Sequence, residues 1–304
     1  MMTLCFPAMP PYPWYYVVVP AKVPAEAKPA ILQVELLKKF PWLVHGFSTR
    51  HAGNLGFTKD ASRPTVERDR EVFVQRITRS DAWPLVTLRQ IHSDIIHHVK
   101  QASEHPLAGD GLLTRTPGLL IAIQTADCLP VIVADSRKRA IAVFHAGWRG
   151  TVKRIVEKGV GEMRRDFGTQ PKDVYATIGP GVHECCYQVG PEVRERFESQ
   201  FAYAADLFRE TKESDEIHER YPLLFLTARA PGHGESHFPK KIFLDLVEAN
   251  RRQLLDSGVP AKHITASPLC TSCRGDLLFS YRREKESAGR LMGVAGIRKS
   301  GFGL

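Results

Sequence analysis

Short apolar runs separated by turn-forming residues dominate the middle of the chain, and they predict buried β-strands. Three of them cover residues 118–125, 129–134 and 139–145, and two later runs cover 174–179 and 291–297. Runs of this length, rich in β-branched residues and bounded by polar or turn residues, are typical of strands rather than helices. Polar and potentially reactive residues follow the first three runs.

Longer stretches repeat their apolar residues with helical spacing. Residues 151–167 predict an amphipathic helix, with Gly168 placed as its C-terminal cap. Similar helices are predicted at 191–201 and 242–257. Helices and strands alternate without a strict βαβ rhythm, so we expect an α+β fold, a single domain with mixed β-sheets flanked by helices.

The first 30 residues differ from the rest of the chain in composition. They carry seven of the 21 prolines, which disfavour regular helix and favour an extended arm. From residue 31 the composition is globular, without a Gly/Ser linker or an internal repeat. We therefore predict a Pro-rich N-terminal extension over 1–30 and one catalytic domain over 31–304.

Composition narrows the class of protein. The chain has 304 residues with 43% hydrophobic residues, 42 Lys and Arg against 33 Asp and Glu, and six cysteines. No apolar run reaches the roughly 18 to 20 residues that cross a bilayer, no signal peptide is recognisable, and so few cysteines fit a reducing compartment. We expect a cytoplasmic protein that does not associate with membranes.

The net charge of +9 raises the question of nucleic-acid binding. The basic residues alternate with acidic ones along the predicted helices, which is typical of solvated helix faces. Nucleic acid is therefore not an expected partner, although the positive balance would favour a small anionic substrate such as phosphate. The oligomeric state stays open, and a monomer is assumed.

Three segments place possible metal ligands where predicted strands end: residues 90–94, 125–130 and 144–151. His92, Cys128 and His145 together supply three ligands for zinc and leave a fourth position open. They are separated by too many residues for a zinc finger and suit a catalytic metal assembled from different strands. From the residues alone, the alternative is structural histidines and a buried cysteine that acts as a small apolar side chain.

Five segments in this order resemble a known family. They are Gln90-Ile91-His92, Ala126-Asp127-Cys128-Leu129-Pro130, His145-Ala146-Gly147-Trp148-Arg149-Gly150, Ile178-Gly179-Pro180 with Cys186-Tyr187-Gln188-Val189-Gly190, and Phe279-Ser280-Tyr281-Arg282-Arg283. Together they resemble the YfiH-type laccase-domain family, also called multicopper polyphenol oxidase-like proteins and regarded as purine nucleoside phosphorylases. The resemblance runs from about residue 43 to residue 297.

The resemblance implies a catalytic zinc ion (Zn2+) held by His92, Cys128 and His145, and an α+β fold. It also implies phosphorolysis of adenosine, inosine, guanosine and methylthioadenosine to a base and ribose 1-phosphate, together with deamination of adenosine. Purine nucleosides and phosphate would be the partners. Laccase chemistry is not expected, because the other histidines show no pattern that could hold several coppers.

Candidate substrate residues lie close to these motifs. Arg50, Arg70 and Arg149 are candidate phosphate ligands, because an arginine fork donates two parallel hydrogen bonds to an anion. Gln90 is a candidate substrate contact. Asp127 is a candidate catalytic residue that orients a ligand or carries a proton, with a turn-capping carboxylate as its alternative.

The chain departs from the family pattern at two positions. The loop after Arg50 is shortened, which puts a covering loop of the site in doubt. Asp69-Arg70 stands where Asn-Arg is common, so the arginine is kept while the residue beside it is not.

Two other functions are compatible with the residues. In a metal-free cysteine hydrolase, Cys128 would be the nucleophile and His145 or His92 the base, with an amide or peptide precursor of the cell wall as a possible substrate. A basic nucleic-acid-binding module without catalytic activity would instead show salt-dependent binding to DNA or RNA.

Overall fold

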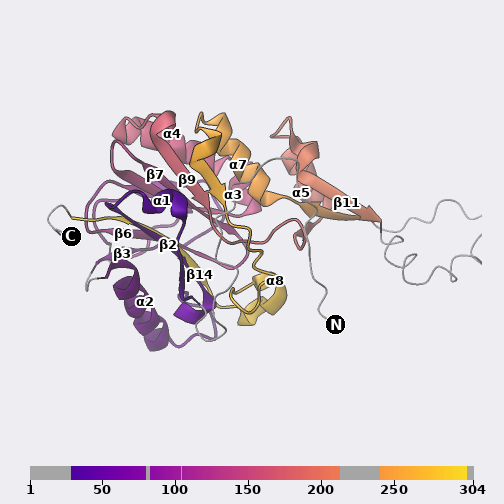
Figure 1. The fold of residues 1–304 in the computed structure, drawn as a ribbon. Helices are drawn as coiled ribbons and strands as arrows, with labels where there is room; N and C mark the ends of the chain where they lie inside the picture. Colours follow the sequence, from indigo (N-terminus) through magenta and orange to yellow (C-terminus); the bar gives the residue numbers. More distant parts are fainter. Residues whose placement is uncertain (1–28, 80–82, 104, 213–239, 300–304) are drawn as a thin grey trace, which may run out of the picture. The chain divides into compact units, whose positions relative to one another are not determined.

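A computed structural model describes residues 29–79, 83–103, 105–212 and 240–299 (Figure 1). The chain divides into two compact units, one made of the segments up to His183 and from Leu246 onward, the other of Glu184–Asp245. The predicted extension over 1–30 lies outside the described residues except for its last two positions.

The larger unit contains two sheets. The first has five strands in the order β1-β2-β14-β6-β3, and β3 runs parallel to β6 while the other pairs are antiparallel. Its strands are β1 (Ile31–Leu32), β2 (Leu43–Ser48), β3 (Leu85–Val86), β6 (Leu120–Thr125) and β14 (Leu291–Ile297). The central β14 pairs with β2 from Gly293 to Ile297 and with β6 from Leu291 to Gly296.

The second sheet has six strands in the order β13-β9-β7-β8-β5-β4. They are β4 (Ile96–His98), β5 (Gly111–Thr114), β7 (Leu129–Asp135), β8 (Ala140–Ala146), β9 (Val174–Ile178) and β13 (Ile264–Ala266). The outer pairs β13 with β9 and β4 with β5 are parallel, and the inner pairs are antiparallel. Both sheets are therefore mixed.

The two sheets pack face to face and share one apolar core. Phe47, Ile121 and Ile297 from the first sheet and Ile132 and Val143 from the second belong to the same buried cluster. Helix α2 (Arg63–Thr78) covers the other face of the first sheet, and α4 (Ile155–Phe167) with α7 (Leu246–Asp256) covers that of the second (Figure 1). Because each sheet is covered on both faces, β7 and β8 are buried along their whole length.

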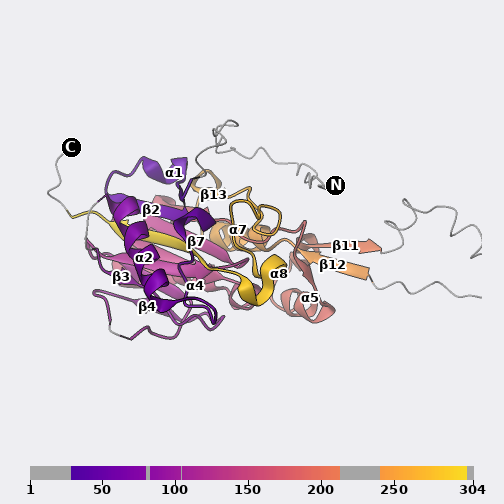
Figure 2. The same cartoon turned by 90° about the horizontal axis from the view of Figure 1, so that it is seen from below.

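Short helices complete this unit. α1 (Glu35–Lys38) buries Leu37 beside β2, and α1 and α2 lie on opposite sides of that strand in both views (Figure 2). α3 (Trp148–Val152) follows β8, and α8 (Tyr281–Glu284) precedes β14. Single 3-10 turns lie at Arg50–Ala52, Pro171–Asp173, Ala261–His263 and Lys285–Ser287.

The smaller unit is built on a three-stranded antiparallel sheet in the order β10-β12-β11. Its elements are β10 (Gln188–Val189), α5 (Pro191–Glu198), a 3-10 turn at Ala204–Leu207, β11 (Phe208–Lys212) and β12 (Lys240–Leu244). Phe197, Phe201 and Leu207 are buried in it.

The α+β class and the mixed sheets flanked by helices are confirmed, and the five predicted strands correspond to β6, β7, β8, β9 and β14. The continuous helix predicted at 151–167 is wrong at its start, because Arg154 adopts a left-handed conformation with φ 63° and separates α3 from α4. The carbonyl of Thr151 accepts a hydrogen bond from the Gln253 side chain, so α7 replaces part of the bonding that a continuous helix would have supplied.

Two other sequence predictions need correction. The helix predicted at 242–257 begins only at Leu246, because residues up to Leu244 pair with β10 and β11 as β12. The helix predicted at 191–201 ends at Glu198. Among the described residues, no helix has both the length and the apolar character needed to cross a bilayer.

Candidate metal centre

His92, Cys128 and His145 come together in the larger unit. One ligand atom from each lies within 4.8 Å of the others, and the Cys128 Sγ and His92 Nε2 atoms are 4.0 Å apart. The imidazole rings of His92 and His145 meet edge to face, with their centroids 4.9 Å apart. His92 is exposed, Cys128 is half-buried and His145 is buried, so the trio has one side open to solvent.

The turn between β6 and β7 presents the Cys128 sulfur. Asp127 has a φ of 91°, a left-handed conformation that is uncommon outside glycine and that reverses the chain sharply. On the other side of the sulfur, Gly147 is the N-cap of α3, and a Cβ atom there would lie 2.8 Å from Sγ of Cys128 and 3.3 Å from Cδ2 of His92. The absence of a side chain at residue 147 therefore lets the two ligands approach each other.

Asp110, which sequence reasoning missed, joins two of the ligands. Its carboxylate accepts a 2.7 Å hydrogen bond from Nδ1 of His145. It also accepts hydrogen bonds from the backbone N–H groups of residues 91, 92 and 93 at 3.2, 3.1 and 2.6 Å, and from the Ser93 hydroxyl at 2.7 Å. Asp110 therefore fixes the loop of His92, which has a φ of 57°, and leaves Nε2 of His145 as its ligand atom.

Cys128 and His145 each stabilise the charged form of the other. Burial alone would raise the pKa of the Cys128 thiol, but the neighbouring His145 and hydrogen bonds to both histidines lower that pKa to about 6. Burial alone would lower the pKa of His145, but Cys128 and Asp110 raise it to about 9. The pKa of Asp110 falls well below its usual range, because hydrogen bonds from His145 and Ser93 outweigh its burial. The site thus favours a thiolate, the form that binds metals and acts as a nucleophile.

The carboxylate of Asp127 is fully engaged by a segment near the C-terminus. Its Oδ1 atom accepts a hydrogen bond from the Thr271 hydroxyl, and its Oδ2 atom accepts one from the backbone N–H of Arg282, both at 2.6 Å. Its carbonyl accepts a hydrogen bond from Val182 N at 2.8 Å. These contacts stabilise the turn that carries Cys128.

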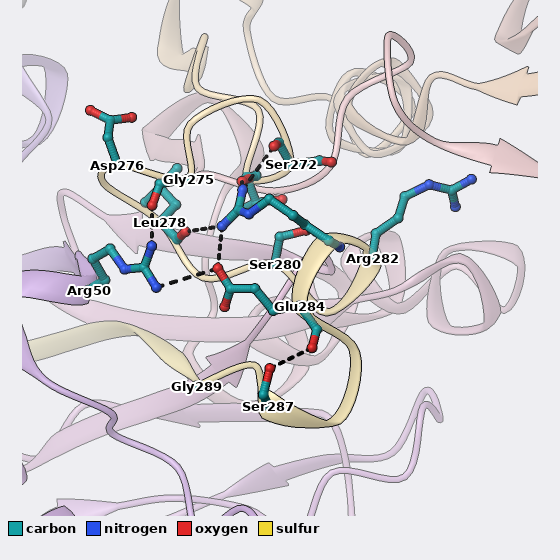
Figure 3. Close-up of polar contacts among 12 residues, drawn as sticks. Arg50, Ser272, Gly275, Asp276, Leu278, Ser280, Arg282, Glu284, Ser287 and Gly289 are labelled. Carbon is teal, nitrogen blue, oxygen red and sulfur yellow. Dashed lines mark hydrogen bonds and ion pairs between the residues drawn. The ribbon is translucent and has the colours of Figure 1, made fainter.

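Two arginines, Arg50 and Arg283, donate hydrogen bonds to the segment that holds Asp127 (Figure 3). The Arg283 guanidinium donates 2.8 Å hydrogen bonds to the carbonyls of Thr271, Ser272 and Leu278. Arg50 donates to the Gly275 carbonyl and lies 3.4 Å from the Glu284 carboxylate. Arg50 is therefore bound to the loop that supports the Asp127 turn.

The other predicted site residues occupy different surroundings. Gln90 exchanges two hydrogen bonds with the backbone of Gln124, at 2.8 and 2.7 Å, and so ties the His92 loop to β6. Arg149 is exposed, and its guanidinium lies 4.4 Å from the Trp148 ring centroid. Neither contact involves the trio directly.

Arg70 keeps an unused donor. Its Nε atom donates to the Leu55 carbonyl at 2.8 Å, and its guanidinium lies 4.4 Å from the Phe57 ring centroid. Its Nη2 atom is buried without a hydrogen-bond partner. Burial lowers the pKa of Arg70 to about 10, so the side chain stays charged at neutral pH and can donate a hydrogen bond to a bound anion.

A comparison with known protein families finds a match that covers most of this chain. A family profile described as "Multi-copper polyphenol oxidoreductase laccase" matches residues 44–298. The chain belongs to this family. The resemblance drawn from the five sequence motifs is thereby confirmed.

Curated relatives carry two kinds of name. The chain is 31% identical to "Purine nucleoside phosphorylase YlmD" of Geobacillus stearothermophilus over 86% of its own length and 92% of that protein. It is 37% identical to "Purine nucleoside phosphorylase" of Bacteroides thetaiotaomicron, where the match spans 62% of this chain and 61% of the relative. It is 36% identical to "Adenosine deaminase RL5" of an unknown prokaryotic organism, over 69% and 74% of the two chains.

Solved structures share the fold. The Bacillus licheniformis hypothetical protein YfiH superposes with a TM-score of 0.75 at 29% identity, covering 89% of this chain and 97% of that chain. YlmD from Geobacillus stearothermophilus gives a TM-score of 0.72 at 27% identity, covering 90% and 98%. The family thus accounts for the arrangement of the sheets as well as for the motifs.

Proposed function

We propose that this protein is a zinc-dependent purine nucleoside phosphorylase that also deaminates adenosine. The observation that carries the proposal is the cluster of His92, Cys128 and His145, held by Asp110 in a chain whose relatives bear both names. The substrates would be purine nucleosides and phosphate.

The donor set fits zinc. Two imidazole nitrogens and one thiolate are ligands that zinc prefers, and a catalytic site keeps a fourth position open. Tetrahedral coordination would bring the ligand atoms to about 3.6 Å from one another, close to the 4.0 Å between Cys128 Sγ and His92 Nε2. A zinc ion held there would supply Lewis acidity and lower the pKa of a bound water toward about 7.

The surrounding residues would orient ligands and substrate. Asp110 holds the His145 ring in one tautomer and one direction, which raises the basicity of Nε2. Arg70 is the candidate phosphate ligand with a donor to spare, whereas Arg50 already binds the Gly275 carbonyl and Glu284. The two occupied oxygens of Asp127 support a positioning role for this residue rather than a proton carrier.

Metal analysis followed by turnover of adenosine and inosine, with and without phosphate, tests the proposal. We expect about one zinc per chain, phosphate-dependent release of adenine and hypoxanthine, and phosphate-independent conversion of adenosine to inosine. Chromatography of bases and sugars separates these reactions.

Variants connect the reactions to the site. Cys128→Ala should lose the metal and both activities while circular dichroism stays unchanged. His105→Ala, which removes an exposed histidine outside the trio, is the matched control and should keep both. Full turnover by Cys128→Ala would overturn the proposal.

A metal-free cysteine hydrolase is the second candidate, favoured by the lowered pKa of the half-buried Cys128 thiol. It predicts stoichiometric alkylation of Cys128 by iodoacetamide in protein purified without zinc. Hydrolysis of amide or peptide substrates would then depend on Cys128 and on one of the two histidines. Protection of Cys128 from alkylation by added zinc would instead favour the first proposal.

A further inference from the structure

A cavity of about 310 Å³ opens beside β2, away from the candidate metal centre. It lies where α1, the end of α2 and the residue after β14 approach one another. Its apolar lining comes from Ile31, Phe40, Pro41, Leu43 and Ile77. This volume is at the lower end of the range for small-molecule sites.

The polar part of the lining is strongly cationic. Lys38, Arg76, Arg79 and Arg298 all line the cavity, and no aspartate or glutamate does. Lys38 is paired with Glu35, and Arg298 donates to the Thr78 carbonyl at 3.2 Å. Within the described ranges, Arg76 and Arg79 form no ion pair.

The negative end of the α2 helix dipole accounts for only some of the four cations that line the cavity. The C-terminus of a helix carries about half a negative charge and attracts cations in its last turn. Arg79 caps the helix through its backbone, and Arg298 already binds the Thr78 carbonyl. Two guanidinium groups therefore remain available to an external anion.

A buried histidine adds an unpaired ring nitrogen to this lining. His45 is 2% exposed, and its Nε2 atom lies 3.1 Å from the backbone nitrogen and 3.2 Å from the carbonyl oxygen of Val34. Its Nδ1 atom has no hydrogen-bond partner, and it donates or accepts according to which ring nitrogen carries the proton. A buried polar atom without a partner is costly unless a ligand or water forms a hydrogen bond with it.

We propose that this cavity binds a small phosphate monoester. The phosphoryl group would lie between Arg76 and Arg79, because arginine forks match phosphate oxygens, and Nδ1 of His45 would form a hydrogen bond with a hydroxyl group of the carbon part. The carbon part would lie against Phe40 and Leu43. The four cations and the absence of carboxylates exclude a cationic ligand.

The cavity is distinct from the candidate metal centre. Leu43 and Arg298 line it at the Ile297 end of β14, whereas Leu291 at the other end pairs with Thr125, just before the Cys128 turn. The length of β14 separates the two ends by roughly 20 Å. Binding in the cavity should therefore be independent of Cys128.

Calorimetric titration of the full chain with glycerol 3-phosphate at low salt tests the proposal, with glycerol as the uncharged comparison. We expect one bound molecule per chain and no binding of glycerol. The double variant Arg76→Gln/Arg79→Gln should weaken binding about tenfold or more. Arg68→Gln, on the same helix but outside the lining, should bind as the wild type does, and Cys128→Ala should too.

Nitrogen-15 NMR of the imidazoles gives a second readout that does not depend on affinity. Glycerol 3-phosphate should shift the Nδ1 signal of His45, which His45→Gln assigns by its disappearance. An unchanged His45 signal at saturation would overturn the proposed placement.

Three calorimetric outcomes would overturn the proposal. They are no heat of binding in the wild type, equal affinity of the double variant and Arg68→Gln, and loss of binding in Cys128→Ala. Binding of a short single-stranded RNA without binding of glycerol 3-phosphate would identify the four cations as an open nucleic-acid surface instead.

Discussion

Two buried histidines in neighbouring sheets have opposite electrostatic characters. His145 on β8 is 4% exposed and His45 on β2 is 2% exposed. The pKa of His145 rises to about 9, because Cys128 and Asp110 outweigh its burial. The pKa of His45 falls to about 4, because its burial is opposed only by weaker contacts with Val34 and Glu35.

The difference lies in the negative groups that contact each ring. The pKa of His145 is raised by the Cys128 sulfur and by the Asp110 carboxylate, which accepts a hydrogen bond from Nδ1 of His145 at 2.7 Å, whereas Nδ1 of His45 has no partner. Burial disfavours the charged form of both rings, and only a neighbouring negative charge reverses that effect. The candidate metal centre therefore contains its own countercharge, whereas the cavity beside His45 presents positive charge for which an external anion would compensate.

The largest effect should follow removal of that internal countercharge. Asp110→Asn should lower metal affinity about 10- to 100-fold, because the second hydrogen-bonding partner of His145 is lost. It should also destabilise the fold by about 3 kcal/mol, since a buried charged partner is removed. Metal competition with a chelator and urea unfolding measure the two quantities.

Asp135→Asn is the matched control for Asp110. Asp135 is also fully buried and accepts backbone N–H bonds from Arg137 and Lys138 at 2.8 and 2.9 Å. Its substitution should cost stability without changing metal affinity. Equal metal affinity in the two variants would show that Asp110 does not act on the site.

A smaller effect should appear in the pH dependence of stability at His45. Its folded pKa of about 4 lies below the ordinary value of 6.5, so the unfolded chain binds a proton first as the pH falls. Its contribution to stability is present above pH 6.5 and is lost as the pH falls toward 4. Between pH 7.5 and pH 5, wild type should lose about 2 kcal/mol more than His45→Gln.

Urea unfolding of wild type, His45→Gln and His105→Gln at the two pH values measures this difference. His105 is exposed, so His105→Gln should behave as the wild type does. Parallel pH profiles for all three proteins would mean that His45 is not held neutral by its surroundings.

Crowding the ligands should perturb the metal centre without altering its charge. In Gly147→Ala, the new Cβ atom would lie 2.8 Å from Cys128 Sγ, and such overpacking costs about 1 to 3 kcal/mol. We expect weaker metal binding, measured by chelator competition, while the pH profile of His45 stays unchanged. Unaltered metal affinity would show that the turn shifts freely.

The smallest effect should come from a glycine with open space around it. Gly161 lies in α4, and no atom outside its own helical surroundings lies within 4 Å of a Cβ placed there. Gly161→Ala should stabilise the fold by about 0.4 to 1 kcal/mol, because it restricts the unfolded chain. A loss of stability in thermal unfolding would contradict this expectation.

The sequence predicted the core strands well because their signal is local. The strands β6, β7 and β8 lie between two covered faces, so each is a short uninterrupted apolar run bounded by turn residues. The break at Arg154 and the strand β12 escaped prediction, since α7 and the strands β10 and β11 determine them from distant parts of the sequence.

The candidate site was likewise predicted only in part. The five motifs indicated His92, Cys128 and His145, and the structure places them together. Asp110 lies between two glycines just before β5, a sequence pattern that is typical of a turn. The residues next to it in the sequence do not indicate that His145 is its hydrogen-bond partner. That hydrogen bond spans 35 residues, and only the pairing of β5 with β8 brings the two side chains together.

The sequence by itself determined the types of residue: three side chains of kinds that can bind a metal, apolar runs for two sheets, and an excess of cations. The tertiary structure decided their partners, and with them their charge states. Two histidines with the same intrinsic pKa differ because the fold places the Cys128 sulfur and the Asp110 carboxylate against His145 and leaves Nδ1 of His45 without a partner. Contact with a neighbouring charge depends on distances across the fold, which no local pattern in the chain records.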